Sequence, residues 1–136
     1  MGGDCTAMGY INKCLLDTNV LISICEKKAD PFSDIEKEIG KTEFFVFQGT
    51  LEEIEKLAKQ GRRIERCFNL IKKIVKEKCK VIDQKGYVDD LINIISSKDQ
   101  IDIIVTNDSE LIDRLKSFKV KIFRMKKNGM FVLIKG

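Results

Sequence analysis

The stretch LLDTNVLI at residues 15–22 decides the fold class, because a strand pattern changes into a helix pattern at a single acidic residue. Residues 13–16 (KCLL) predict a short buried strand that ends at Asp17. Residues 19–28 (NVLISICEKK) predict a helix. A strand that leads directly into a helix is the expected first unit of an α/β domain.

The alternation of strand and helix patterns continues along the chain. Further strands are predicted at 44–47, 80–83, 102–106, 120–123 and 130–134, and further helices at 32–39, from Thr50, at 64–75, 87–97 and 108–117. Asn128-Gly129 predicts a hairpin between the last two strands. This order indicates an α/β fold with a mainly parallel sheet. We expect one domain at residues 11–136 after a flexible tail at residues 1–10.

Composition limits the function classes. The chain has 136 residues, of which 43% are hydrophobic, and no apolar run approaches the ~20 residues that span a bilayer. Histidine is absent, which excludes Ser-His and Cys-His catalysis and histidine-ligated metals. The five cysteines show no C-x-x-C spacing, so a zinc site is not expected. Most of them lie in apolar patterns as core residues, and we expect a cytoplasmic protein without membrane contact.

Acidic residues stand where strands end. Asp17 follows the first strand, and Asp108 follows IIVTN at residues 103–107. Glu53 and the pair Asp89-Asp90 lie near the starts of helices that follow other strands. Ligands of open α/β sheets bind at the carboxyl ends of the strands, so we expect these carboxylates to gather on one edge. Such a cluster is costly unless a cation neutralises it, and Mg²⁺ or Mn²⁺ prefers oxygen ligands.

Asp17 and Glu53 each have a structural alternative. Aspartate is a good N-cap, so Asp17 can simply start the following helix. Thr50 and Glu53 have the spacing of a capping box, in which the glutamate side chain bonds back to the start of the helix.

The remaining acids have comparable alternatives. Asn107 or Asp108 can cap the helix that follows, with Glu110 three residues after Asn107. Asp89 and Asp90 can be first-turn acids favoured by the helix dipole, and the helical wheel does not rank one above the other. The functional interpretation therefore depends on the conjunction of the four positions.

Four segments together resemble the PIN-domain nucleases: LLDTNVLI at 15–22, TLEEIEKL at 50–57, YVDDLI at 87–92 and IVTNDSEL at 104–111. They occur in the order of that family and cover nearly the whole chain after residue 11. One departure is Gln48-Gly49, where many members carry a proline, and it leaves the start of the following helix open. The closest likeness within the family is to small archaeal members, either toxin ribonucleases of the VapC type or ribosomal-RNA processing proteins.

The resemblance implies an α/β/α sandwich and a Mg²⁺- or Mn²⁺-dependent endoribonuclease. It assigns the four catalytic and metal-binding acids to Asp17, Glu53, Asp89 and Asp108, and supporting roles to Asn19, Asp90, Thr106 and Asn107. The metal would activate water for hydrolysis that leaves a 5′-phosphate and a 3′-hydroxyl. The Thr106 hydroxyl would hold a carboxylate or water in place.

Expected partners follow from charge and from the family. The net charge of +4 weakly favours a polyanion, and Arg62, Arg63, Arg66, Lys126 and Lys127 are candidate RNA contacts. Most of these cations have a solvated surface as the alternative, and we place residues 61–63 in a turn. Aromatic residues are few (7%), so no stacking platform for single strands is evident.

Other partners and functions remain open. A protein antitoxin, a ribosome-assembly factor or a second copy in a homodimer are the protein partners that the resemblance suggests. The alternatives to an active ribonuclease are a non-catalytic RNA-binding assembly module and a toxin nuclease controlled by an antitoxin.

Overall fold

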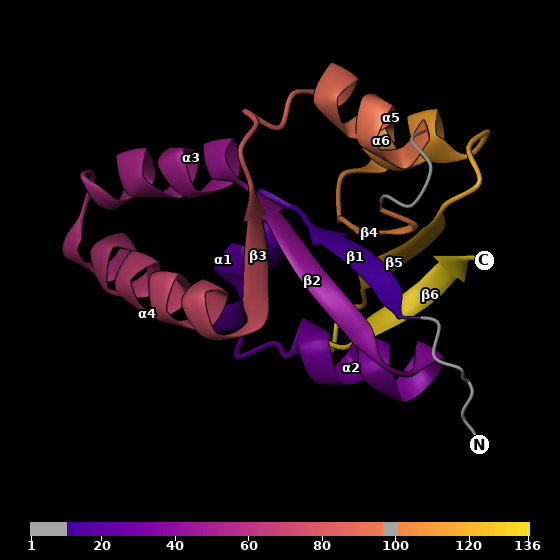
Figure 1. The fold of residues 1–136 in the computed structure, drawn as a ribbon. Coiled ribbons are helices and arrows are strands. Elements are labelled where there is room, and N and C mark those ends of the chain that lie inside the picture. The colour runs from indigo at the N-terminus through magenta and orange to yellow at the C-terminus, as the bar shows by residue number, and fades with distance from the viewer. Residues whose placement is uncertain (1–10, 97–100) are drawn as a thin grey trace.

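A six-stranded sheet forms the centre of the computed structural model, which describes residues 11–96 and 101–136 (Figure 1). Its strands are β1 (Asn12–Leu16), β2 (Thr42–Phe47), β3 (Cys79–Ile82), β4 (Ile103–Val105), β5 (Lys121–Met125) and β6 (Phe131–Lys135). They lie in the order β3-β2-β1-β4-β5-β6. All neighbouring pairs are parallel except β5 and β6. The predicted, mainly parallel sheet is confirmed.

Six helices are present in the described ranges. They are α1 (Thr18–Glu26), α2 (Pro31–Ile39), α3 (Gln48–Ala58), α4 (Arg62–Lys78), α5 (Val88–Ser96) and α6 (Ser109–Leu115). Pro31 is the first residue of α2, where its fixed φ suits the helix and its missing N–H costs nothing.

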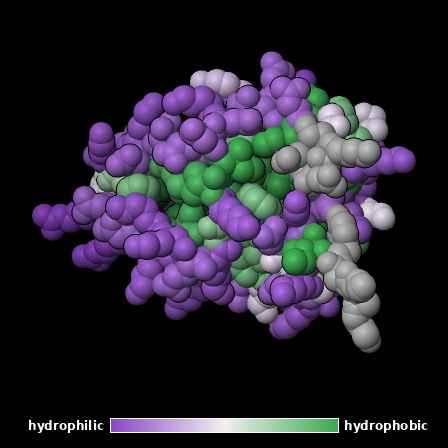
Figure 2. Space-filling view, viewed as in Figure 1, coloured by the Kyte–Doolittle hydropathy of each residue, from purple (hydrophilic) through white to green (hydrophobic). Residues whose placement is uncertain are grey.

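Helices cover both faces of the sheet, because neighbouring strand residues point to opposite sides. Cys14 and Leu16 belong to a core shared with α1, α2, α3 and α4, whereas Leu15 belongs to a second core shared with α5 and α6. Ile103 and Ile104 divide in the same way. The three-layer α/β/α arrangement is therefore confirmed. In the view of Figure 2, a band of hydrophobic residues crosses the strands and is bordered by hydrophilic side chains of α3 and α4.

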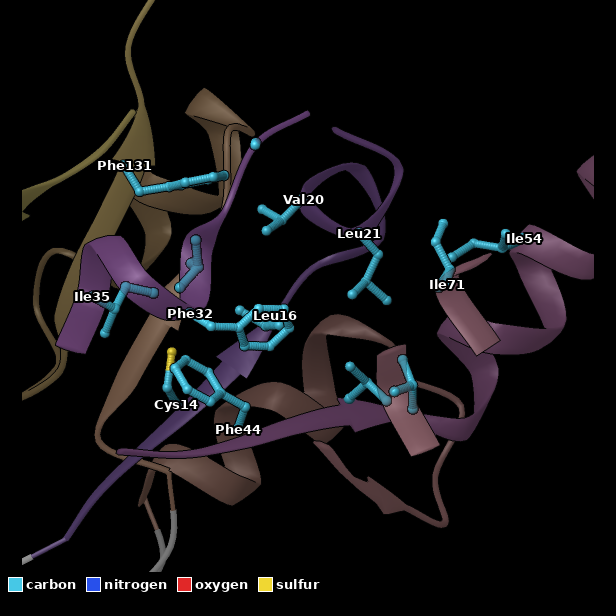
Figure 3. Packing of buried hydrophobic residues seen from close by; sticks show 14 of the residues in the cluster. Cys14, Leu16, Val20, Leu21, Phe32, Ile35, Phe44, Ile54, Ile71 and Phe131 are labelled. Atoms are coloured by element: carbon cyan, nitrogen blue, oxygen red, sulfur yellow. The ribbon is translucent and has the colours of Figure 1, made fainter. Parts of the chain in front are cut away.

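The first core ties α2 to the sheet. Phe32 and Phe44 pack edge to face, with ring centroids 4.8 Å apart, and Ile35 lies beside them (Figure 3). Aromatic pairs in this geometry stabilise a core by about 0.5–1.5 kcal/mol beyond their buried area. The carboxylate of Asp34 accepts a hydrogen bond from the Phe131 backbone N–H at 3.0 Å, which fixes the start of β6 against α2.

The predicted hairpin is present between β5 and β6. The Lys126 N–H donates to the Met130 carbonyl at 2.7 Å, and Gly129 has a φ of 89°. The side chain of Asn128 accepts from the Met130 N–H at 3.0 Å. Glycine is favoured at Gly129 because side chains disfavour a positive φ.

Two predicted boundaries were wrong. Helix α3 begins at Gln48 and not at Thr50, because Phe47 has extended backbone and Gly49 already lies in the helix. The segment at 61–63 is not a turn, since Arg62 and Arg63 form the first turn of α4. The other elements differ from the prediction by one to three residues at their ends, and the predicted tail at residues 1–10 lies outside the described residues.

The cysteines only partly behave as predicted. Cys14 and Cys67 are buried core residues, but Cys67 on α4 forms a disulfide with Cys25 on α1. The spacing of the cysteines did not indicate this pair. Within residues 11–96 and 101–136, no helix combines the length and apolar character that a membrane crossing requires.

Candidate active site at the ends of β1 and β4

The strand order reverses between β1 and β4. From β1 the chain continues to β2 on one side, and it later returns to place β4 on the other side. The helices that follow β1 and β4 lie on opposite faces, so a crevice forms at the carboxyl ends of these two strands. Asp17 follows β1 directly, and residues 106–108 follow β4.

Both oxygens of the Asp17 carboxylate accept a hydrogen bond. Oδ1 accepts from the Thr18 N–H at 2.8 Å, which makes Asp17 the N-cap of α1. Oδ2 accepts from the Thr106 hydroxyl at 2.9 Å. The capping interpretation is therefore correct, and it uses one of the two oxygens. A carboxylate oxygen has two lone pairs, so capacity for a further ligand remains.

Thr106 joins the two strand ends. Its side chain is fully buried at 0% exposure, and its hydroxyl donates to Asp17 while accepting from the Asp108 N–H at 3.1 Å. The Thr106 N–H continues the sheet by donating to the Phe123 carbonyl at 3.1 Å. The predicted role of Thr106, to hold a carboxylate in place, has this geometric basis.

Glu53 reaches the site from α3. Its Oε1 accepts from the Thr18 hydroxyl at 2.9 Å, and the side chain is exposed. The capping-box interpretation was wrong, because Thr50 is buried inside the helix and the helix start has no side-chain cap. Thr18, the middle residue of the D-T-N motif, was missed as a functional residue. Its position directly after Asp17 was the available signal.

Asp108 is the N-cap of α6. Its Oδ1 accepts from the N–H groups of Glu110 at 3.0 Å and Leu111 at 3.3 Å. The carboxylate is exposed, unlike that of Asp17. The capping alternative is again correct, and the cap holds Asp108 next to Thr106.

The pKa of Asp17 is affected by burial and by the other acids of the site. Burial raises the pKa of the Asp17 carboxyl above its ordinary value, and the charges of Asp108 and Glu53 raise it further. The hydrogen bonds from Thr106 and Thr18 act in the opposite direction. The site therefore holds negative charge at a cost that a cation would relieve.

Asp89 and Asp90 lie in the first turn of α5, and the structure separates their roles. Asp90 Oδ2 accepts from the N–H groups of Gly86 at 3.0 Å and Tyr87 at 3.1 Å, so it fixes the start of its own helix. Asp89 is exposed. Neither residue is among the charges that shift the pKa of Asp17.

The predicted four-acid cluster is not present. In the described part of the chain, no three acidic or cysteine side chains are placed so that they could hold a metal ion together. The structure brings Asp17, Glu53 and Asp108 within electrostatic reach, and it leaves Asp89 on a separate helix start.

A pocket lies beside Asp17, and its wall includes the side chain of Lys85, which was not among the predicted site residues. It is lined by polar and glycine residues from three segments, namely Asp17, Thr18, Gly49, Thr50, Glu53, Lys85 and Gly86, and by apolar residues beneath them. Lys85 and Gly86 come from the loop between β3 and α5. Their signal in the sequence was a lysine–glycine pair just before the YVDDLI segment.

The other predicted residues occupy different places. Asn107 Oδ1 accepts from the Met125 N–H at 2.9 Å, so Asn107 fixes the site loop to β5. Asn19 is exposed on α1. Lys126 and Lys127 lie in the β5–β6 turn, near Arg124, whose guanidinium donates to the Ser109 hydroxyl at 3.2 Å.

The arginines on α4 are far from the acids. Arg62, Arg63 and Arg66 are exposed at the start of α4. The connection between α3 and α4 lies at the left of Figure 1, away from the ends of β1 and β4. At 1.5 Å per residue, the part of α3 that follows Glu53 spans about 7.5 Å of the separation between these cations and the site.

The donor set fits a hard divalent cation. Carboxylate and hydroxyl oxygens are the ligands that Mg²⁺ prefers, and Mg²⁺ is usually bound through only one or two carboxylates while it keeps several waters. Asp17 with either Glu53 or Asp108 supplies that number. A site that needs three direct protein carboxylates is not offered by the described residues.

Comparisons with known proteins agree with the fold. The family profile described as a PIN-like domain matches residues 14–128. The PIN domain endonuclease Utp24 is similar with a TM-score of 0.70 and 22% identity, over 96% of each chain. VapBC2 from Rickettsia felis, solved with a DNA fragment from its promoter, gives a TM-score of 0.56 and 15% identity over 84% of this chain and 99% of that one. VapBC-1 from nontypeable Haemophilus influenzae gives 0.52 and 13% over 79% and 96%. No curated sequence matches.

Proposed function

Because the chain belongs to the PIN-like domain family, we propose that it is a Mg²⁺- or Mn²⁺-dependent endoribonuclease whose centre is Asp17. The observation that carries the proposal is the environment of this carboxylate. It lies at the strand-order reversal, beside a pocket, and its pKa is raised by burial and by the charges of Asp108 and Glu53. A carboxylate in a pocket whose pKa is raised by burial and by neighbouring charges is a candidate functional group.

Asp17 is the primary metal ligand in this proposal. Its two hydrogen bonds fix the orientation of the carboxylate before a metal binds, which lowers the cost of binding. Glu53 and Asp108 complete the coordination directly or through water. Asp89, on the separate start of α5, has no part in this coordination.

Each protein group has a defined task in hydrolysis. A bound divalent ion would lower the pKa of water and neutralise charge on the phosphate. Thr106 holds Asp17 and the Asp108 backbone at a fixed separation, and Thr18 holds Glu53. Glu53, whose side chain is exposed, would orient the attacking water. The expected products carry a 5′-phosphate and a 3′-hydroxyl.

The test is cleavage of labelled RNA by purified protein with Mg²⁺, with Mn²⁺ and with a chelator. Asp17→Asn and Asp108→Asn remove one negative charge each while keeping a side chain that can cap a helix. Both variants are expected to lose cleavage by at least about 100-fold, because the metal loses a ligand. A DNA strand of the same sequence shows whether the substrate is RNA.

Asp30→Asn is the matched control. Asp30 is also an N-cap aspartate, and its Oδ1 accepts from the Ser33 N–H at 3.1 Å at the start of α2. It does not line the pocket. Wild-type cleavage by Asp30→Asn together with loss in Asp17→Asn supports the proposal. Metal-independent cleavage, equal activity in Asp17→Asn, or an inactive wild-type protein with both metals contradicts it.

A further inference from the structure

The loop at residues 83–87 forms one wall of the pocket beside Asp17, and its backbone is fixed against α3. The Gly49 N–H donates to the Gln84 carbonyl at 3.0 Å. A Cβ atom at Gly49 would lie 1.7 Å from the Lys85 carbonyl oxygen, so only glycine allows this approach. Gly86 has a φ of +90°, and a Cβ atom at this position would lie 2.8 Å from the Phe47 ring.

The same loop is held from α5. The Asp90 carboxylate accepts from the N–H groups of Gly86 and Tyr87. The two anchors, α3 on one side and Asp90 on the other, fix the backbone of Lys85, Gly86 and Tyr87 at the pocket. Two side chains project from this fixed segment, one cationic and one aromatic.

Lys85 is the cation of the pocket. It lines the same pocket as Asp17 and Glu53, and its amino group donates to Glu52 Oε1 at 3.0 Å. The ion pair is exposed, with 63% of the Lys85 side chain accessible, so it contributes little stability and can exchange. An ammonium group has three donors, and a phosphate oxygen can take one that Glu52 does not use.

Tyr87 is the aromatic group next to Lys85. It is 71% exposed, more than any other exposed large hydrophobic residue in the described part of the chain. Tyr87 follows Lys85 by two positions, and its chain neighbours Gly86 and Val88 line the pocket together with Lys85. An exposed ring beside a cation is the combination that binds unpaired bases and their phosphates.

We propose that loop 83–87 binds one unpaired nucleotide of the substrate beside Asp17, with Tyr87 stacking on the base and Lys85 contacting its phosphate. The proposal rests on the ribonuclease function and adds to it a binding position for one nucleotide at this loop. It also gives Asp90 a positioning role in the loop. The stacking surface in this proposal is a single exposed tyrosine whose chain neighbours line the pocket.

Binding is measured without cleavage, in the Asp17→Asn background, with a fluorescent single-stranded RNA and with a hairpin of paired bases. Tyr87→Ala is expected to weaken single-strand binding by about tenfold, whereas Tyr87→Phe keeps the ring and binds as the parent does. Lys85→Met is expected to reduce the slope of log affinity against log salt by about 0.7, the effect of one phosphate contact. Lys85→Arg restores the slope.

The matched control is Lys80→Met. Lys80 pairs with Glu43 at 2.7 Å and is similarly exposed, but it lies on β3 outside the pocket. Its loss is expected to leave the salt slope unchanged. Equal slopes for Lys85→Met and Lys80→Met, unchanged affinity in Tyr87→Ala, or tighter binding of the paired hairpin overturns the loop proposal.

These outcomes separate the two proposals. A wild-type protein that cleaves RNA while its Lys85 and Tyr87 variants bind normally refutes the loop alone. A protein that binds single strands through Lys85 and Tyr87 but never cleaves refutes the ribonuclease proposal alone. Absence of measurable RNA binding overturns the loop proposal as well.

Discussion

Replacing Thr106 with valine removes the hydroxyl that joins the two strand ends and keeps the shape of the side chain. The residue is fully buried, and its oxygen lies 2.9 Å from Asp17 Oδ2 and 3.1 Å from the Asp108 nitrogen. The variant leaves the partly buried Asp108 N–H without its acceptor and the Asp17 Oδ2 without its donor. Both groups are costly to leave unpaired.

The expected loss of stability follows from these two bonds. A hydrogen bond to a charged group contributes about 1.5–3 kcal/mol and a neutral one about 0.5–1.5 kcal/mol. The added buried methyl group of valine returns up to about 0.8 kcal/mol. Thr106→Val should therefore lower the free energy of unfolding by about 2–3 kcal/mol, and the melting temperature by roughly 10 °C for a domain of this size.

Urea denaturation followed by circular dichroism measures the change. The midpoint should fall while the slope m stays constant, because the fold is unchanged. Thr106→Ser keeps the hydroxyl and loses a methyl group, at a cost of about 1 kcal/mol. RNA cleavage separates the two variants: the serine variant should stay active, and the valine variant should lose about tenfold or more, as expected for a group that orients a metal ligand.

Thr42→Val is the control. The Thr42 hydroxyl donates to the Gly40 carbonyl at 2.9 Å at an exposed position outside the site, so its loss should cost under about 1 kcal/mol. The reasoning is refuted if Thr106→Val costs no more than Thr42→Val. It is also refuted if the serine and valine variants lose cleavage equally.

Three further perturbations test the site and its support. The pKa of Asp17 in the folded protein is raised, chiefly by burial. The free energy of unfolding should therefore fall as pH rises from the ordinary aspartate pKa through the raised one. Asp17→Asn should lack this loss and be more stable than wild type in urea at neutral pH. Gly49→Ala should lower the unfolding free energy by about 1–3 kcal/mol, because its Cβ meets the Lys85 carbonyl. Reduction of Cys25–Cys67, 42 residues apart, should lower the unfolding free energy of the protein by about 4 kcal/mol in thermal or urea denaturation.

Each of these three predictions has a control or an outcome that would contradict it. Gly61→Ala places a Cβ in open space and should change stability by less than about 0.5 kcal/mol; an equal cost for Gly49→Ala would contradict the packing argument. A parallel pH dependence for Asp17→Asn and wild type would show that Asp17 is not the titrating group. Unfolding that is insensitive to reductant would show that the cysteine pair adds no constraint.

Local pattern was sufficient for the fold class and for most of the elements. The apolar run at residues 13–16 and the helix after Asp17 are both present, as are the strand that precedes Thr106 and the Asn128-Gly129 hairpin. These features follow from side-chain periodicity and turn chemistry, which act over a few residues. The start of α3 at Gln48 was not predictable in this way, because it depends on a loop that packs against Gly49 from far along the chain.

The candidate acids are where strand ends in an α/β sheet place them, and Asp17 was identified on that ground. The sequence alone did not decide which groups each carboxylate contacts. Tertiary structure decided that Asp17 and Asp108 cap helices and share Thr106, that Glu53 contacts Thr18, and that Asp90 holds a loop. The bonds from Thr106 to Asp17 and from Thr18 to Glu53 join residues 89 and 35 positions apart, so no local pattern encodes them, whereas the caps and the Asp90 contacts lie within a few residues.

The position of Asp17 and its raised pKa therefore have different causes. Its position after a buried strand is a property of the local sequence, since an apolar run must end where the chain leaves the core. Its electrostatic character is a property of the folded chain, because burial and the charges of Asp108 and Glu53 raise its pKa only when β1, β4 and α3 are assembled. Lys85 lies in the pocket for the same reason, because the packing of Gly49 fixes its loop beside the acids.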